Sequence, residues 1–334
     1  MDSLNLLLEQ QDLTFEQANS FFDLVMQGEV SEIELTAALI ALKIKKETAQ
    51  EIAGAAKAMR DHATKFNAHN LVCADSCGTG GDGSNTINVS TTAAIAAAAC
   101  GINLVKHGNR SVSSKSGSAD LLRTLGINIE MTPEQASVCL KETGFTFLFA
   151  PLYHLGVKHA MPVRTTLKTR TIFNILGPLT NPAAPQVQLL GVYDKSLCRP
   201  MAETLKTLGT ERAMIVHGEG TDEIALHGTT HVAELVDGEI KEYTLTVDDF
   251  GVEHYSLDQI AGDTPEYNAK ASIEILNGSA PDAHNAAIAV NVAALLVMHN
   301  LAADFKAATQ QVLAVLKSGK AADKLKEIVE VSNG

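Results

Sequence analysis

The sequence changes pattern near Asn70, and each side of this point predicts a different kind of fold. Before it, three capping boxes predict the starts of helices, because Ser or Thr is followed three residues later by Glu or Gln. These boxes are Thr14-x-x-Gln17, Ser31-x-x-Glu34 and Thr48-x-x-Glu51. Apolar residues follow at helical spacing, and Gly28 is placed to end the first of these helices. The helices are short with broad apolar faces, so we expect them to need a partner surface.

After Asn70, short apolar runs alternate with glycine-containing loops and helical patterns. The apolar runs are residues 101–105, 127–129 and 213–216, and residues 230–243 predict two strands joined by an Asp-Gly turn. A helix start follows at Thr132-Pro133, with proline in the first turn. Alternating strands and helices are typical of an α/β domain. A chain of 334 residues is also long enough for about two domains.

The charge of the chain argues against one class of partner and favours another. Its net charge is −13, which makes non-specific binding to a nucleic-acid backbone unfavourable. Yet residues 83–119 and 143–193 contain no acid, although both stretches contain Lys and Arg. Two acid-free stretches in such an acidic chain indicate a local pocket for a small anion. Chance and burial are the alternative explanation.

No segment of the sequence predicts a membrane span or a secretory signal. The uncharged stretch at residues 87–105 is rich in Ala and contains Asn, Ser and Thr, so insertion into a bilayer is unfavourable. The N-terminus lacks a basic flank before its short Leu run. The five cysteines are scattered and form no Cys-x-x-Cys pair, so we expect reduced thiols in a cytoplasmic protein.

A glycine-rich stretch, Gly78-Thr-Gly-Gly-Asp82-Gly83, is the first candidate for a binding site. Glycines allow the backbone to lie directly against a ligand, and successive bare N–H groups can bind phosphate oxygens. The stretch matches neither a P-loop nor a dinucleotide fingerprint. Ser90 and Thr91 follow it where the N-cap of a helix is expected, so the positive end of that helix would face the same ligand.

A second polar run, residues 106–120, follows a predicted strand. It contains Lys106, His107, Asn109 and Arg110 together with several hydroxyls. Ligands of open α/β sheets usually bind at the ends of such strands. A lysine and serine hydroxyls suit phosphate and ribose groups. A structural role for His107 is an equally good interpretation.

The third element, His217-Gly-Glu-Gly-Thr-Asp222-Glu223, follows the strand predicted at residues 213–216. Adjacent carboxylates in a protein suited to phosphate indicate a magnesium site, because magnesium prefers a few carboxylates plus waters and substrate phosphates. The same residues are also typical of a solvated acidic turn. Spacing alone does not decide between the two.

Taken together, these motifs resemble those of the anthranilate phosphoribosyltransferase family over nearly the whole chain. The matching stretches are Asp75–Asp82, Asn88–Thr91, Lys106–Arg110 with Ser113-Ser114, Gly117–Asp120, Arg170–Asn174, Leu176–Leu179 with Asn181-Pro182, and Asp222-Glu223. The resemblance implies transfer of phosphoribose from 5-phosphoribosyl 1-pyrophosphate (PRPP) to anthranilate in tryptophan biosynthesis. It also implies a dissociative mechanism in which magnesium assists the departure of pyrophosphate.

The resemblance assigns roles to residues only where the motifs match. PRPP would be bound by Gly78, Gly81, Asp82, Thr86, Asn88, Val89, Ser90, Thr91, Lys106, His107, Gly108, Asn109, Arg110, Ser113, Ser114 and Ser118. Magnesium would be bound by Ser90, Asp222 and Glu223, and anthranilate would be positioned by Asn109, Arg164, His107 and Gly78. Leu155 and the run Thr166-Leu-Lys168 depart from the family pattern near the anthranilate side.

The family fold implies a small helical domain at residues 1–68, with a contribution from about 158–183, and an α/β domain at 69–334. The α/β domain would have a mainly parallel sheet of the nucleoside phosphorylase and phosphoribosyltransferase class. The family also implies a homodimer formed through the helical domain. Two alternatives are a pyrimidine nucleoside phosphorylase, whose Lys-His-Ser-Thr-Gly-Gly loop this chain lacks, and a non-catalytic relative that binds nucleic acid.

Overall fold

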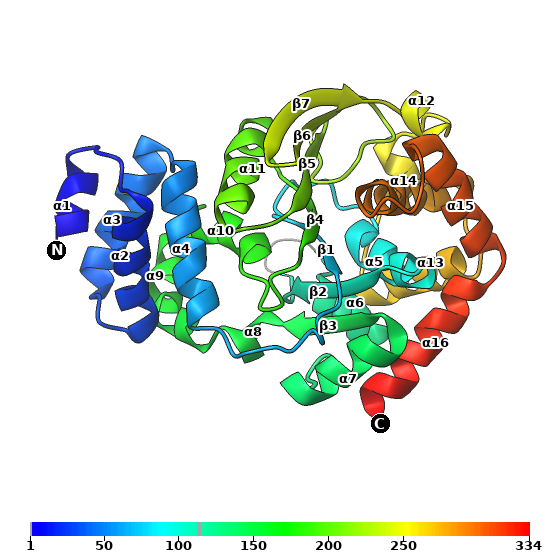
Figure 1. Ribbon diagram of the computed structural model, residues 1–334, viewed down its shortest axis with the longest axis horizontal. Coiled ribbons are helices and arrows are strands. Elements are labelled where there is room, and N and C mark those ends of the chain that lie inside the picture. Colours follow the sequence, from blue (N-terminus) through cyan, green and yellow to red (C-terminus); the bar gives the residue numbers. More distant parts are fainter. Residues whose placement is uncertain (1, 112–114) are drawn as a thin grey trace.

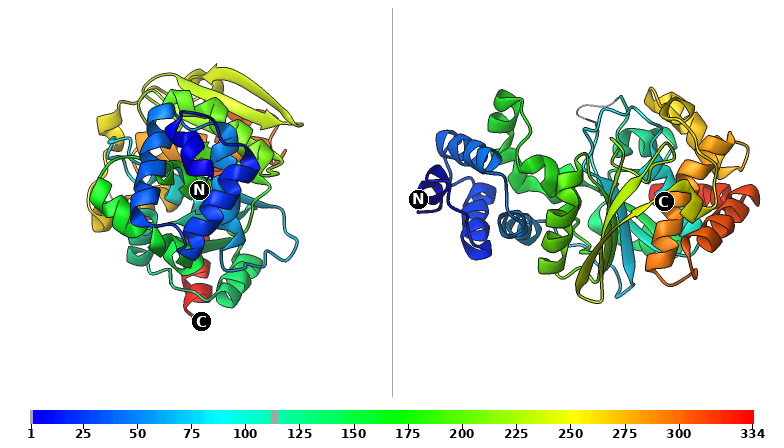
Figure 2. Two further views of the ribbon diagram at one scale, coloured as in Figure 1. Left: turned by 90° about the vertical axis from the view of Figure 1, so that its left-hand side faces the viewer. Right: turned by 90° about the horizontal axis from the view of Figure 1, so that it is seen from above.

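The computed structural model describes residues 2–111 and 115–334 and has two parts (Figure 1). A group of helices from the N-terminal region lies at one end, and a seven-stranded sheet with its covering helices forms the rest. The right-hand view of Figure 2 shows from above that the N-terminal helices project from the body of the molecule. Within the described residues, no helix is long and apolar enough to cross a membrane.

The N-terminal region contains four helices, and the three predicted capping boxes each precede one of them. The helices are α1 (Asp2–Leu8), α2 (Phe15–Gln27), α3 (Glu32–Lys45) and α4 (Ala49–Asp61). The residues Thr14, Ser31 and Thr48 are the N-caps of α2, α3 and α4, and each box is formed in both directions. Gly28 ends α2 in the left-handed conformation, at φ 79°. The sequence prediction is confirmed here.

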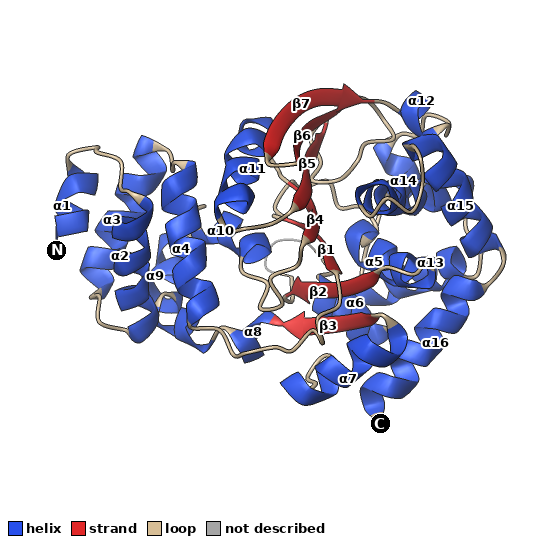
Figure 3. Cartoon of the chain, viewed as in Figure 1, coloured by secondary structure: helices blue, strands red, loops and turns tan. Residues whose placement is uncertain are grey.

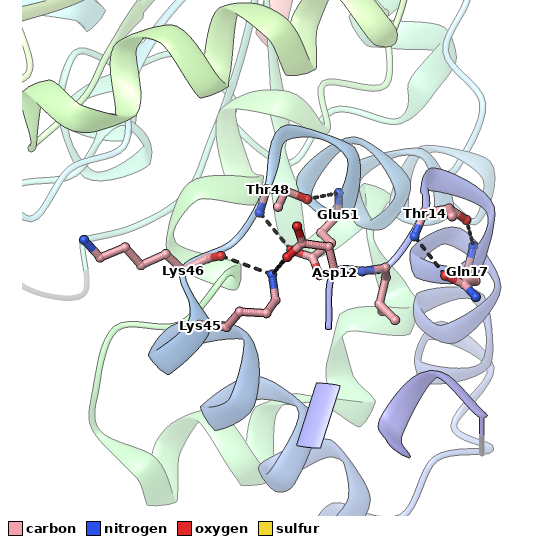
Figure 4. A network of polar contacts seen from close by, with 8 residues as sticks. Asp12, Thr14, Gln17, Lys45, Lys46, Thr48 and Glu51 are labelled. Carbon is pink, nitrogen blue, oxygen red and sulfur yellow. Dashed lines mark hydrogen bonds and ion pairs between the residues drawn. The ribbon is translucent and has the colours of Figure 1, made fainter. Parts of the chain in front are cut away.

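A buried ion pair joins the loops between these helices (Figure 4). The carboxylate of Glu51 is fully buried and accepts hydrogen bonds from the backbone N–H groups of Leu13, at 2.9 Å, and Thr48, at 2.8 Å. The Nζ of Lys45 lies 2.8 Å from the same carboxylate and 2.6 Å from Asp12. One charged group of α4 therefore fixes both the entry to α2 and the turn between α3 and α4.

The sheet is mainly parallel, as the sequence predicted (Figure 3). Its strands are β1 (Cys73–Gly78), β2 (Asn103–Gly108), β3 (Phe145–Phe149), β4 (Val187–Gly191), β5 (Arg212–Gly218), β6 (Thr230–Val236) and β7 (Glu239–Leu245). They lie in the order β3-β2-β1-β4-β5-β6-β7. The first five strands are parallel to one another, and β6 pairs antiparallel with both β5 and β7. The chain first adds strands on one side of β1 and then continues on the other, so the strand order reverses between β1 and β4.

The helices cover both faces of this sheet. After α4 the chain forms α5 (Val89–Ala99), α6 (Ser118–Thr124), α7 (Pro133–Thr143), α8 (Ala150–Tyr153), α9 (Met161–Leu167), α10 (Phe173–Leu176), α11 (Cys198–Thr207), α12 (Val247–Phe250), α13 (Pro265–Leu276), α14 (Asp282–Met298), α15 (Phe305–Lys317) and α16 (Lys320–Asn333). Short 3-10 helices occur at η1 (Leu155–His159), η2 (Gly177–Leu179), η3 (Lys195–Leu197) and η4 (Leu257–Ile260). One core contains α5 and α13–α16, a second contains α11 and the N-terminal helices, and a third, smaller one contains side chains of α7 and of β1 to β3.

Residues 158–183 pack with the N-terminal helices, although they lie far from them in the sequence. Val163 of α9 and Phe173 of α10 belong to the same buried cluster as Phe22 of α2, and the rings of Phe22 and Phe173 meet edge to face at 6.0 Å. The helix α9 also contacts α3. We propose on this packing that the segment be counted with the helical domain.

One apolar run predicted after Asn70 does not form a strand. Ile127 and Ile129 are both buried, but they lie in the turns between α6 and α7. Their side chains join the core that contains α5 and α16. A run of three residues with two apolar side chains fits a buried turn as well as a strand, and here packing decides the outcome.

Candidate active site

Three of the predicted motifs meet at the carboxyl edge of the parallel strands. The glycine-rich loop follows β1, the polar run 106–120 begins at the end of β2, and residues 219–223 follow β5. Because these strands are parallel, their carboxyl ends lie at the same edge of the sheet. The loop after β1 lies where the strand order reverses, which is the usual ligand position in such folds.

Two glycines allow the loop after β5 to lie directly over β1 and β4. A Cβ at Gly78 would lie 2.2 Å from Oδ2 of Asp222, and one at Gly191 would lie 1.5 Å from the carbonyl oxygen of Asp222. The backbone N–H of Gly80 donates a hydrogen bond to the Asp222 carboxylate at 2.7 Å. The backbone N–H of Asp222 donates to Asp82 at 3.4 Å. The glycine loop and Asp222 therefore form one unit.

Lys106 provides the buried cation of the site. Its side chain is 1% exposed, and its Nζ donates to the carbonyl oxygen of Ser76 at 2.6 Å and to Oγ of Ser90 at 3.5 Å. The backbone N–H of Ser90 in turn donates to Glu223 at 3.2 Å. Lys106, Ser90 and Glu223 come from three different segments, and these contacts bring them together.

The electrostatics of the two carboxylates favour a bound cation. Burial, and then the neighbouring charge of Asp82, raise the pKa of Asp222 to about 7. Burial and the charge of Asp222 raise the pKa of Glu223 well above its usual value, although Lys106 opposes this. Both pKa values rise chiefly because burial penalises the charged form and secondarily because the anions repel one another, and a divalent cation would offset both effects. Oxygen donors of this kind fit magnesium.

Among the described residues, no group of three or more His, Cys, Asp or Glu side chains is arranged as a complete metal site. Magnesium rarely needs one, since it usually takes one or two carboxylates and keeps waters and substrate phosphates. The donors that Asp222, Glu223 and the hydroxyl of Ser90 offer fit this preference.

The helix after the glycine loop begins earlier than the sequence predicted. Its N-cap is Asn88, and Ser90 and Thr91 lie in its first turn, so their assignment as N-caps is wrong. The side chain of Asn88 makes no capping bond, because its Nδ2 donates to the carbonyl of Ser116 at 3.0 Å and its Oδ1 accepts from Oγ of Ser116 at 2.9 Å. The first backbone N–H groups of α5 still face the site.

Asp120 connects the two described parts of the polar run, residues 106–111 and 115–120. The carboxylate of Asp120 accepts hydrogen bonds from the backbone N–H groups of Ser111 and Gly117, both at 3.0 Å. Thr91 of α5 donates to Oγ of Ser118 at 3.1 Å. The run is thereby held against the first turn of α5. Ser113 and Ser114 lie outside the described residues.

A second group of predicted residues lies toward the helical domain. His107 is buried at the end of β2, its Nδ1 lies 3.2 Å from the carbonyl of Gly177, and its ring meets that of His154 at 5.0 Å. Burial lowers the pKa of His107 to about 3 and that of His154 to about 4, so both rings are neutral. The guanidinium of Arg164 lies 5.2 Å from the ring centroid of Phe173.

The remaining predicted residues are placed as follows. Asn109 is exposed and accepts from the N–H of Arg110, while the guanidinium of Arg110 lies 4.0 Å from Glu130, away from the carboxylate pair. Thr86 forms a bridge with Ala261. Val89 is buried in the core, and Gly108 lies against Phe147 and Ser118. Arg164 and Asn109 do not contact each other through any described hydrogen bond.

Sequence reasoning missed three residues that build this site. Asp75 is fully buried, its carboxylate accepts from Nδ2 of Asn181 at 2.9 Å, and burial raises its pKa to about 6 although Lys106 opposes this. His154 lies against His107. Arg170 donates to the carbonyl of Gly81 and stacks over Tyr193 at 4.1 Å. Arg170 and Asp75 lie inside matched motifs, which was the available signal.

Comparison with known proteins agrees with this architecture. Residues 1–63 match the helical bundle domain of the glycosyl transferase family, and residues 70–322 match its α/β domain. The anthranilate phosphoribosyltransferase of Pseudoalteromonas translucida is 64% identical over 98% of this chain and 92% of its own length. The enzyme of the same name from Photobacterium profundum is 58% identical over 94% of this chain and 93% of its own.

Solved structures give the same result. The anthranilate phosphoribosyltransferase of Thermus thermophilus superposes with a TM-score of 0.95 at 38% identity and covers 100% of both chains. A structure of the Saccharomyces cerevisiae enzyme in complex with PRPP and magnesium superposes with a TM-score of 0.91 at 29% identity, over 99% of this chain and 97% of the other.

The helical bundle, the α/β domain and the site between glycine loop, lysine and carboxylates define a glycosyl transferase of the two-domain class. Within that class, the relatives share most of their length and up to 64% of their residues with this chain. The chain belongs to the anthranilate phosphoribosyltransferase family. The predicted fold class is confirmed.

Proposed function

We propose that this chain transfers the phosphoribosyl group of PRPP to the amine of anthranilate, which gives N-(5-phosphoribosyl)anthranilate and pyrophosphate in tryptophan biosynthesis. The observation that carries the proposal is the meeting of glycine loop, Lys106 and carboxylate pair at one edge of the sheet. This arrangement suits a polyanionic substrate with a bound cation. The names of the relatives support the same reaction and favour neither a nucleoside phosphorylase nor a nucleic-acid-binding protein.

On the donor side, we assign PRPP to the N–H groups of residues 81–83 in the glycine loop, the first turn of α5 and Lys106, since the N–H groups of Thr79 and Gly80 already donate to Gly191 and Asp222. These groups carry positive charge or partial positive charge, and they converge from separate elements. Asp222, Glu223 and Ser90 would hold magnesium. When bound, this ion neutralises negative charge that grows on the departing pyrophosphate.

The chemical step breaks the bond between C1 of the ribose and a pyrophosphate oxygen, and the amine nitrogen of anthranilate forms the new bond to C1. Positive charge develops on the ribose ring while the leaving group gains negative charge. Lys106 and the N–H groups of the glycine loop are preorganised to stabilise that negative charge. The nitrogen then releases one proton to water. The anthranilate amine is neutral near pH 7, so positioning supplies much of the catalysis.

On the acceptor side, we assign anthranilate to Asn109, Arg164, His107 and Gly78. Arg164 supplies a cation that suits the carboxylate of anthranilate. Its stacking on Phe173 connects it to the helical domain. The neutral ring of His107 can contact an aromatic acceptor without adding charge.

The test is a fluorescence assay of anthranilate consumption with PRPP, with and without magnesium. Loss of fluorescence only when protein, PRPP and magnesium are all present supports the proposal. Arg164→Ala should then raise the KM for anthranilate more than the KM for PRPP. Phosphorolysis of thymidine in place of anthranilate consumption would favour a nucleoside phosphorylase, and a trapped covalent ribosyl-enzyme would refute the direct displacement.

We further propose a homodimer formed through the helical domain. Large apolar side chains are exposed on its helices, among them Ile33, at 83%, and Ile44, at 70%, both on α3. Exposed apolar groups of this size are typical of a surface that a partner covers. Light scattering of the intact protein and of Ile33→Glu tests the proposal, since the variant should shift toward monomer.

The five cysteines are all free, which supports the cytoplasm as the compartment of this protein.

A further inference from the structure

A segment late in the chain lies against both loops of the donor site. The carbonyl of Ile260 accepts from the backbone N–H of Ile87 at 2.9 Å, and the N–H of Gly262 donates to the carbonyl of Asn85 at 2.8 Å. A Cβ at Gly262 would lie 2.3 Å from the carbonyl of Thr86, so the approach is close. Residues 260–262 therefore run along the backbone that connects the glycine loop to α5, and α13 begins just after them.

Asn268 of α13 is a buried side chain that connects this segment to the start of α5. It is 2% exposed, and its Nδ2 donates to Oδ1 of Asn88 at 2.8 Å. Its own Oδ1 accepts from the backbone N–H of Asp263 at 2.9 Å. Both ends of the buried amide are therefore satisfied, and each bond fixes the orientation of the other.

Asn88 connects Asn268 to the second loop of the site, residues 115–118. Its Oδ1 accepts from both Asn268 and Oγ of Ser116, and its Nδ2 donates to the carbonyl of Ser116. Asn88 also precedes the first turn of α5, while Ser116 lies next to Gly117, which Asp120 holds. One amide of α13 thus sets the position of the helix start and of the loop that returns to α6. A surface ion pair between Lys115 and Asp263, at 2.5 Å, ties the same two segments.

We propose that Asn268 is a positioning residue for PRPP. It does not touch the substrate. Through Asn88 and Ser116 it holds the start of α5 and the 115–118 loop in register, so that groups from both meet the same polyanion. The inference rests on the proposed function, because it assigns PRPP to these two loops.

The experiment compares wild type with Asn268→Asp, Asn268→Ala and a control, Ser272→Ala. Aspartate keeps the acceptor for the N–H of Asp263 but cannot donate to Asn88, so it removes one contact with little change of shape. Ser272 lies one turn further on α13, is 1% exposed, and its hydroxyl bonds that of Thr92 on α5 at 2.7 Å rather than Asn88 or Ser116. Steady-state KM for each substrate, calorimetric Kd for PRPP with magnesium, and melting temperature are measured for all four proteins.

In Asn268→Asp one buried hydrogen bond is lost, and Oδ1 of Asn88 then faces a carboxylate. This change should raise the KM and Kd for PRPP about tenfold. The KM for anthranilate should stay within about twofold, because that substrate is held by other residues. Ser272→Ala should leave both KM values within about twofold of wild type even where its melting temperature falls.

A Kd for PRPP in Asn268→Asp equal to that of wild type would overturn the inference. Equal rises in both KM values, matched by Ser272→Ala at the same loss of melting temperature, would show a merely structural role and also overturn it. If wild type consumed no anthranilate, the proposed function would fail. The calorimetric comparison of wild type and Asn268→Asp would still decide the inference.

Discussion

Replacement of Glu51 by Gln tests how much the buried ion pair contributes to the helical domain. The substitution keeps the shape of the side chain and removes its charge. In the structure the carboxylate accepts from two backbone N–H groups and from Lys45, whose side chain is only 7% exposed (Figure 4). An amide would turn a donor toward at least one of these three donors. Of its two carboxylate partners Lys45 would keep only Asp12, whose side chain is 65% exposed, besides its hydrogen bond to the carbonyl of Lys46.

The magnitude follows from these contacts. Breaking a buried pair by removing one partner costs about 3–5 kcal/mol, and the remaining bond to Asp12 offsets part of this. A buried backbone N–H that loses its acceptor adds about 1–3 kcal/mol. The two costs sum to about 4–8 kcal/mol, and the offset from Asp12 brings the expected net loss to about 3 kcal/mol. This corresponds to a factor of roughly 100 in the local opening equilibrium.

Hydrogen exchange followed by mass spectrometry suits this test, because a two-domain chain does not unfold as one unit. Peptides from α2 and α4 should exchange about 100 times faster in Glu51→Gln, while peptides from α14 should be unchanged. The control is Lys57→Met on the same helix, which removes a surface pair with Asp61 whose partners are 46% and 50% exposed, and which should change little. Unchanged exchange in α2 and α4, or equal acceleration in α14, would refute the reasoning.

Three further predictions concern the site. Gly191→Ala places a Cβ 1.5 Å from the backbone of Asp222, so the 219–223 loop must move, and kcat/KM for PRPP should fall by about 100-fold or more in steady-state assays. Arg170→Ala releases the carbonyl of Gly81 and the ring of Tyr193, and the KM for PRPP should rise about fivefold with partial recovery in Arg170→Lys. Burial lowers the pKa of His107 and His154 to about 3 and about 4 from a usual 6.5, so the unfolded chain binds protons first and stability falls as pH drops below 6.5. In melting curves from pH 7 to pH 5, the free energy of unfolding should fall less steeply in His154→Gln than in wild type. Below pH 6.5 the difference in slope should approach about 1.4 kcal/mol per pH unit.

The sequence was most informative where the chemistry depends on local pattern. The capping boxes before α2, α3 and α4 formed as predicted, because each uses residues three apart and needs no other part of the chain. The strand and turn pattern around β5 to β7 was equally local. Where a local pattern was compatible with two structures, tertiary contacts determined which of them formed. Asn88 became the N-cap in place of Ser90 and Thr91, and its side chain is occupied by Ser116 and Asn268.

The sequence encodes the residues suited to bind the substrate differently from the residues that orient them. Gly78, Lys106 and Glu223 could be named from motifs, and parallel strands explain why they meet at one edge although they are far apart in the sequence. The residues that orient them had no such signal. Asn268 acts from a helix that carries no binding motif, and His154 reaches His107 only because the segment after β3 packs toward the helical domain. Motifs identify atoms suited to the substrate, whereas the precision of their placement depends on side chains whose partners only the folded chain supplies. For this reason, variants of the orienting residues should separate substrate affinity from stability more clearly than variants of the motif residues, which change both the contacts and their geometry.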